Sequence, residues 1–172
     1  MQTSSAASRI QANLQDLFKA NLSSGDSYIR FQLTPDMTAL LSMKQVQESL
    51  VVETEKITTL PSMPESAIGI MNSRNRVFCV FDLAQLLGLP SPLGSPRQYQ
   101  VIVLQTTDEQ PIYIGFAVSR LQGMQRISNS EIQPLKETAQ LAPYLCGAII
   151  EKDLNVPVLE FNSILKTLKN IG

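Results

Sequence analysis

The residues able to do chemistry are few in this chain of 172 residues, and they are spread along it. There is no histidine, which removes the commonest general base and the commonest metal ligand. Cys79 and Cys146 stand singly within apolar stretches, where we expect reduced core thiols, and the sequence has no CxxC, no Gly-rich phosphate loop and no GxSxG. Aspartates and glutamates are scattered. We therefore expect no catalytic site, no metal site and no cofactor.

The clearest structural element is the stretch 68–88, IGIMNSRNRVFCVFDLAQLLG. Its apolar start containing Gly69, the turn-forming segment NSRN and the apolar run VFCVF predict a β-hairpin. Asp82 then occupies the position of a helix N-cap and predicts a short helix after the second strand. Two cations, Arg74 and Arg76, lie at the hairpin tip. We therefore expect this stretch to present positive charge and to lack catalytic groups.

A second copy of this unit follows downstream. Gly147 stands 78 residues after Gly69, and at the same spacing the apolar positions of the hairpin and helix match. Earlier positions repeat at a spacing of 75, as in Leu41 and Phe116. Apolar strands resemble one another, so chance similarity is the alternative. The ordered matches favour duplication of a small all-β unit.

Short strands between turn signals favour small barrels, and the repeat predicts two of them side by side. We expect an amphipathic N-terminal helix in residues 1–25, a first barrel over 26–89, a Pro- and Ser-rich linker over 90–97 and a second barrel over 98–172. A terminal helix is expected from Ser163 onward. A groove between the barrels would be the default binding place.

Composition narrows the partners. The 14 Lys and Arg balance 15 Asp and Glu without a basic stripe, so nucleic acid and anionic membrane are not expected as partners. No apolar run reaches the length that crosses a membrane, and the N-terminus lacks the features of a signal peptide. With only two cysteines, these features predict a cytoplasmic protein without membrane insertion.

Several motifs, taken in order, resemble the CheW-type coupling proteins of bacterial chemosensory systems. The matching segments are Val46-Gln47-Glu48, Leu60-Pro61-Ser62-Met63-Pro64, Gly69-Ile70-Met71-Asn72-Ser73-Arg74, Asp82-Leu83 with Leu87-Gly88, Gly115-Phe116-Ala117-Val118 and Tyr144-Leu145-Cys146-Gly147. Each segment alone is weak, whereas their order and spacing are specific. The resemblance covers residues 26–168.

The resemblance implies a mainly β fold of two five-stranded SH3-like β-barrels and a scaffold without enzyme activity. Proteins of this family join a CheA-type histidine kinase, through its regulatory domain, to methyl-accepting chemoreceptors. The resemblance therefore implies those two partners and a place in the cytoplasm at membrane receptor arrays.

The resemblance also implies a set of partner-binding positions: Val46, Glu48, Gly69, Arg74, Gly115 and Gly147. The residue types alone allow simpler roles. Arg74 would be a solvated cation, Glu48 a solvated strand carboxylate and Val46 a core residue, while the glycines would only permit tight turns or close strand contact.

The chain departs from the family pattern at Asn75, Cys79 and Ser119, where the family usually has Gly, Pro and Asp. Asn still permits a positive φ, so the hairpin turn is expected to survive. These departures predict a divergent member, serving chemotaxis, phototaxis or pilus-driven motility.

Two other hypotheses remain. One is a β-barrel interaction module of another regulatory complex that binds partners through its N-terminal helix; deletion of residues 1–25 would distinguish it, because kinase binding should survive under the adaptor hypothesis. The other is an enzyme or ligand-binding protein using the groove between the barrels, which the absence of histidine and of clustered acids disfavours.

Overall fold

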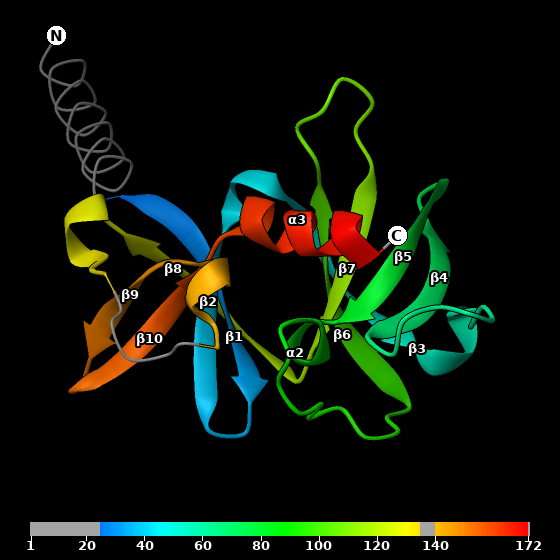
Figure 1. Ribbon diagram of the computed structural model, residues 1–172, viewed down its shortest axis with the longest axis horizontal. Helices are drawn as coiled ribbons and strands as arrows, with labels where there is room; N and C mark the ends of the chain where they lie inside the picture. The colour runs from blue at the N-terminus through cyan, green and yellow to red at the C-terminus, as the bar shows by residue number, and fades with distance from the viewer. Residues whose placement is uncertain (1–24, 135–139, 172) are drawn as a thin grey trace, which may run out of the picture.

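The computed structural model describes residues 25–134 and 140–171 and is dominated by two five-stranded β-sheets (Figure 1). The predictions of a mainly β chain and of two five-stranded units are therefore confirmed. The N-terminal helix expected in residues 1–25 lies outside the described residues, apart from Gly25.

The first sheet, which with its enclosed side chains we call lobe A, has the strand order β8-β1-β2-β10-β9. Its strands are β1 (Asp26–Thr34), β2 (Met37–Ser42), β8 (Arg120–Ile127), β9 (Leu145–Glu151) and β10 (Leu154–Leu159). Neighbouring strands are antiparallel except for β2 and β10, which run parallel.

The second sheet, lobe B, has the order β3-β6-β7-β5-β4. Its strands are β3 (Val46–Glu53), β4 (Ala67–Ser73), β5 (Arg76–Asp82), β6 (Gln98–Gln105) and β7 (Tyr113–Val118). Here β5 and β7 form the parallel pair. The two sheets thus have the same arrangement, with β3, β6, β7, β5 and β4 corresponding in turn to β8, β1, β2, β10 and β9.

Strand registers agree with the repeat found in the sequence. In lobe B, Val80 and Phe81 pair with Gly115 and Phe116. The residues at the repeat spacings of 78 and 75 in lobe A pair with each other in the same way, Val158 with Leu40 and Leu159 with Leu41. The two lobes can therefore be compared residue by residue.

The lobes are, however, not the contiguous units 26–89 and 98–172 that the repeat predicted. Each lobe takes two strands from one half of the chain and three from the other. Both sides of β2 and of β7 are already paired, and only the 3₁₀ turn Met43–Gln45 and the single residue Ser119 follow them. Such connections are too short to carry the chain to a free edge, about two strand spacings of 4.8 Å away, so the chain passes directly into the other lobe.

A central core joins the lobes. It contains Phe31 and Leu41 from lobe A, Phe116 from lobe B, and Phe161 and Ile164 from helix α3 (Phe161–Ile171). The rings of Phe116 and Phe161 pack edge to face with centroids 5.9 Å apart. The predicted C-terminal helix is confirmed and begins two residues earlier than expected; it lies across the junction between the lobes (Figure 1).

Each lobe also encloses its own apolar cluster on the other face of its sheet. Lobe A encloses Tyr28, Leu40 and Val158, and lobe B encloses Phe78 and Val101. Strand β1 is therefore covered on both faces near Tyr28.

The short helix α2 (Leu83–Leu86) begins after Asp82, as predicted. The buried Asp82 carboxylate accepts hydrogen bonds from the Gln85 backbone N–H at 3.3 Å and from the Ser91 hydroxyl. This cap satisfies a backbone donor at the start of the helix. It also ties the helix to the 87–97 loop, which contains the predicted linker.

Candidate functional site

The tip of the β4–β5 hairpin is a two-residue loop formed by Arg74 and Asn75, between the paired residues Ser73 and Arg76. Both loop residues have positive φ, +50° and +63°. Positive φ at both positions is the type I′ pattern that matches strand twist, and Asn is among the residues that tolerate it. The replacement of the family's usual glycine by Asn75 therefore leaves the turn intact.

Glu48 is positioned by a β-bulge in β3. Val46 pairs with Leu104 and Glu48 with the adjacent Val103, so Gln47 is the extra residue. Bulges re-aim the side chains that follow them. From Glu48 onward, alternate residues of β3 face the inside of lobe B, and the Glu48 side chain is only 10% exposed.

Glu48 and Arg74 form an ion pair across the two edge strands of lobe B. The Arg74 Nε lies 3.3 Å from Glu48 Oε2, and the Ser73 hydroxyl donates to Glu48 Oε1 at 3.4 Å. Oε2 is buried and has no hydrogen bond of good geometry within the described residues. The Arg74 side chain is 74% exposed. The pair therefore holds a guanidinium at the surface with donors free to face a carboxylate or carbonyl of a partner.

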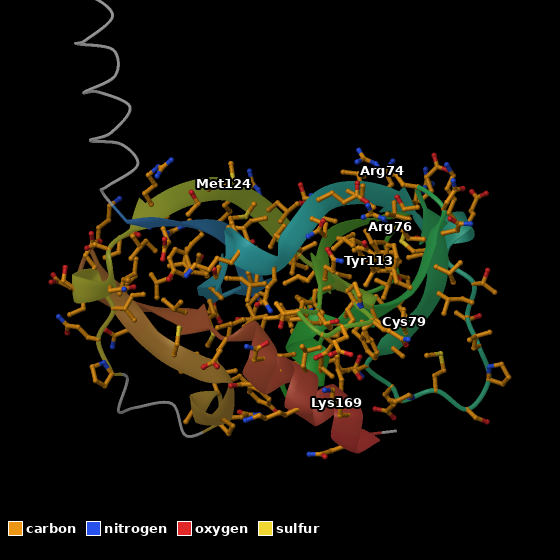
Figure 2. The ribbon with its side chains drawn as sticks, turned by 90° about the horizontal axis from the view of Figure 1, so that it is seen from above. Arg74, Arg76, Cys79, Tyr113, Met124 and Lys169 are labelled. Atoms are coloured by element: carbon orange, nitrogen blue, oxygen red, sulfur yellow. The ribbon has the colours of Figure 1, made fainter. Side chains whose placement is uncertain are left out.

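A second cation lies beside this pair. The Arg76 guanidinium carbon is 4.4 Å from the centroid of the Tyr113 ring, a cation–π contact between β5 and β7 (Figure 2). Val77 and Ile112, next to these two residues in the chain, are exposed. Figure 2 shows Arg74, Arg76 and Tyr113 on the same side of lobe B. The surface there is cationic with apolar neighbours.

Gly69 and Gly147 occupy equivalent buried positions in β4 and β9. Their φ values are +157° and +151°. A Cβ on Gly69 would lie 2.3 Å from the Thr58 carbonyl oxygen, and one on Gly147 would lie 2.6 Å from that of Gln133. Each glycine thus permits a close approach of a neighbouring backbone segment, and that segment extends the sheet of its lobe by two hydrogen bonds of 2.8 Å.

Gly115 and Val46 also face the interior. A Cβ on Gly115 would lie 3.0 to 3.2 Å from Val101, Phe78 and Val80 inside lobe B. Val46 is partly buried and packs against the central core. Of the six positions that the resemblance implied, the structure brings Glu48 and Arg74 into contact, buries the three glycines and leaves Val46 at the edge of the core.

The structure also places residues that the sequence did not single out. The Ser73 hydroxyl donates a hydrogen bond to Glu48, and the Tyr113 ring makes the cation–π contact with Arg76. Ser73 could have been suspected from its place beside Arg74. No sequence signal pointed to Tyr113, because its contact depends on the parallel pairing of β5 with β7.

The exposure of the two cysteines differs from the prediction that both lie in the core. Both are free, Cys79 is half-buried, and Cys146 is exposed rather than in the core. The prediction for Cys146 was wrong because β9 is an edge strand, whose outer face leaves Cys146 and Ile150 exposed. Burial nevertheless raises the pKa of both thiols; the nearby Glu160 carboxylate adds to the effect at Cys146, whereas a backbone hydrogen bond opposes it at each thiol.

Within residues 25–134 and 140–171, no three or more Cys, Asp or Glu side chains are grouped so that they could hold a metal ion. No helix in the same part of the chain is long and apolar enough to cross a membrane.

Comparison with known proteins agrees with this architecture. The protein-family model of the CheW-like domain matches residues 27–169 of this chain. This chain belongs to the CheW-like domain family. The chemotaxis protein CheW of Thermotoga maritima is 30% identical over 83 residues, which are 48% of this chain and 52% of that protein, so the chain spans about half the length of this curated relative.

The CheW-like fold is also found in a solved structure. The scaffolding protein TtCheW of Thermoanaerobacter tengcongensis superimposes with a TM-score of 0.67 at 20% identity, over 80% of this chain and 90% of that one. The similarity supports the arrangement of two interleaved lobes.

Proposed function

We propose that this CheW-like chain is a non-catalytic adaptor that couples methyl-accepting chemoreceptors to a CheA-type histidine kinase at receptor arrays in the cytoplasm. The observation that carries the proposal is the family match over residues 27–169. It is supported by the name of the Thermotoga relative, a chemotaxis protein, and by that of the solved neighbour, a scaffolding protein.

Within this function we propose the Glu48–Arg74 pair as a direct contact with a partner. The exposed guanidinium of Arg74 is restrained by its ion pair with the largely buried carboxylate of Glu48. Less side-chain freedom is therefore lost on binding than for an unrestrained arginine. Val46 lies in the same strand as Glu48 and would border that contact. Gly69, Gly115 and Gly147 would act by shaping the lobes that carry the binding surfaces.

Calorimetric titration of the protein with the regulatory domain of a CheA-type kinase from the same organism tests the proposal. Saturable binding is expected. If Arg74 is a central contact, Arg74→Ala should weaken it by about tenfold or more. Lys169→Ala is the control, because Lys169 is an exposed cation on helix α3, on the opposite side of the molecule from Arg74 (Figure 2). Its affinity should stay unchanged.

The outcomes separate the hypotheses. If Arg74→Ala retains kinase binding but fails to recruit receptor, Arg74 belongs to a receptor surface. Absence of binding to any such kinase would refute the adaptor proposal. Binding that disappears on deletion of residues 1–25 would instead favour an interaction module that uses its N-terminal segment.

A further inference from the structure

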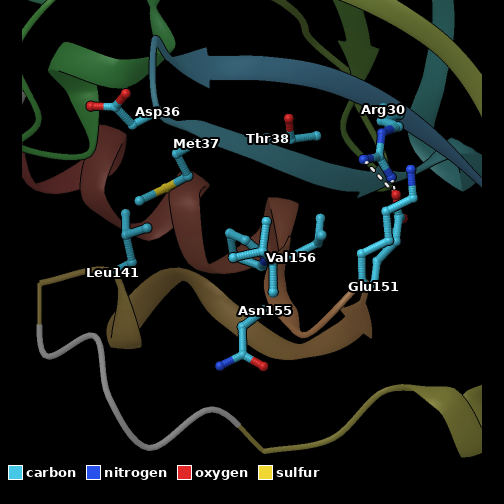
Figure 3. Close-up of a pocket in the computed structure, with 11 residues that line it drawn as sticks. Arg30, Asp36, Met37, Thr38, Leu141, Glu151, Asn155 and Val156 are labelled. Atoms are coloured by element: carbon cyan, nitrogen blue, oxygen red, sulfur yellow. Dashed lines mark hydrogen bonds and ion pairs between the residues drawn. The ribbon is translucent and has the colours of Figure 1, made fainter.

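Lobe A contains a cavity at the open end of its sheet. The cavity has a volume of about 300 Å³ and lies between β1, β2, β9 and β10 (Figure 3). Thr38 and Leu154 line it, with Val156 of the lobe A cluster also contributing. Arg30 and Glu151 form another wall, joined by hydrogen bonds of 2.7 and 3.1 Å.

The internal repeat shows what occupies the same place in lobe B. At the spacings of 75 and 78 residues that the strand registers confirm, Thr38 corresponds to Tyr113 and Leu154 to Arg76. In lobe B the Tyr113 ring packs against the enclosed apolar cluster and is covered by the Arg76 guanidinium at 4.4 Å. Tyr113 and Arg76 therefore occupy in lobe B the place where lobe A has its cavity.

Lobe A lacks both of these groups. Thr38 is smaller than Tyr113 by an aromatic ring, and Val156 replaces Phe78 at the corresponding position of the enclosed cluster. The side chain that lobe A lacks here is an aromatic ring, and among the described residues none takes its place.

We propose that this cavity binds an aromatic side chain presented by a partner protein. The occupant is uncharged, because the charges of Arg30 and Glu151 in the wall are already paired with each other, and the exposed lining residues Asp36 and Lys152 contribute one charge of each sign. Arg30 brings to the wall the same group that stacks on Tyr113 in lobe B, held in place by Glu151 and by Gln125 at 3.0 Å. A ring that enters can therefore gain a cation–π contact with a preorganised guanidinium.

A protein partner fits better than a free small molecule. Leu154 lines the cavity and is 69% exposed, and Met37, which also lines it, is partly exposed. A ring alone would leave these apolar groups in water, whereas the protein surface around an inserted side chain would cover them. The inference is independent of whether the partner is a kinase or a receptor.

The test is a titration of the ¹⁵N- and methyl-labelled full chain followed by NMR. The probes are the capped pentapeptide Gly-Gly-Tyr-Gly-Gly, the same peptide with Leu in place of Tyr, and p-cresol. The tyrosine peptide should shift the signals of Thr38, Leu154 and Val156 saturably, with nuclear Overhauser effects between its ring and the Val156 methyl groups. The leucine peptide should bind about three- to tenfold more weakly.

Two variants complete the design. Thr38→Tyr fills the cavity from within, as in lobe B, and should abolish the shifts, while Thr38→Val keeps the volume and should retain them. Unchanged lobe B signals show that each variant is folded, and the Overhauser contacts in the natural chain test the site without any variant. Absence of those contacts, equal binding of the leucine peptide, or binding retained by a folded Thr38→Tyr would overturn the proposal. Binding of p-cresol alone would assign the cavity to a small aromatic molecule instead.

Discussion

Replacement of Gly147 by alanine should destabilise the protein mainly through the backbone. Gly147 has a φ of +151°, and its missing Cβ is what lets the Gln133 carbonyl approach. The approach is fixed by two hydrogen bonds between Gln133 and Ala148, each 2.8 Å long. The same argument applies to Gly69 and Thr58 in lobe B.

The magnitude follows from two contributions. An L-residue forced to a positive φ costs about 1–2 kcal/mol. Moving the Gln133 segment away from a Cβ that would otherwise lie 2.6 Å from its oxygen weakens two hydrogen bonds, each worth about 1 kcal/mol net. We therefore expect a loss of about 3–4 kcal/mol in the free energy of unfolding. For a domain of this size that loss corresponds to a fall in Tm of about 6–16 °C.

Calorimetry and urea unfolding of Gly147→Ala measure this loss. Gly123→Ala is the matched control, because Gly123 lies in a strand at a φ of +103° but has nothing within 4 Å of its ideal Cβ. Gly123→Ala should show only the backbone strain, about 1–2 kcal/mol. Equal losses in the two variants would refute the argument from close approach. Any loss of partner binding in Gly147→Ala should then be compared at a temperature where the variant is fully folded.

Three further predictions concern the charged and titratable groups. Arg30→Met should lower the free energy of unfolding by about 1–2 kcal/mol in urea titrations, because the half-buried Glu151 loses both hydrogen bonds of its ion pair. Iodoacetamide should alkylate Cys79 more slowly than free cysteine, with a rate that is still rising at a pH where free cysteine has levelled off, because burial raises the pKa of this thiol; peptide mass spectrometry gives the rate. Burial and the nearby Cys146 and Asp26 raise the pKa of Tyr28, so the unfolded chain loses this proton first and the urea midpoint should fall as the pH rises above about 10.

Each of these predictions has a clear contrary result. Lys44→Met serves as the control for Arg30→Met, because the Lys44–Asp26 pair is 3.5 Å long and largely exposed and should contribute little. Equal effects in these two variants would contradict the role of burial. Alkylation of Cys79 at the rate of free cysteine would contradict its burial. Tyr28→Phe should flatten the alkaline fall, and an unchanged profile would assign that fall to other groups.

Local signals in the sequence were sufficient for several elements. The hairpin tipped by Arg74, the helix after Asp82 and the C-terminal helix all depend on turn residues, a cap and apolar periodicity within a few positions, and all are present. Strand β8 carries no such local signal, because it is an edge strand with mostly exposed polar residues and no apolar alternation. Cys146 was misplaced for a related reason, since an apolar run does not reveal that one of its faces lies at the edge of a sheet.

The sequence by itself determined the repeat, the β class and the family, because these depend on the order and spacing of residue types along the chain. The tertiary structure decided which strands share a lobe, because β2 and β7 have no free neighbour and the connections after them are too short to turn back. It also decided the local roles. Whether Gly147 meets a carbonyl oxygen, whether Glu48 supports Arg74, and whether a ring fills the end of a lobe all depend on contacts between residues far apart in the chain, and spacing does not record such contacts.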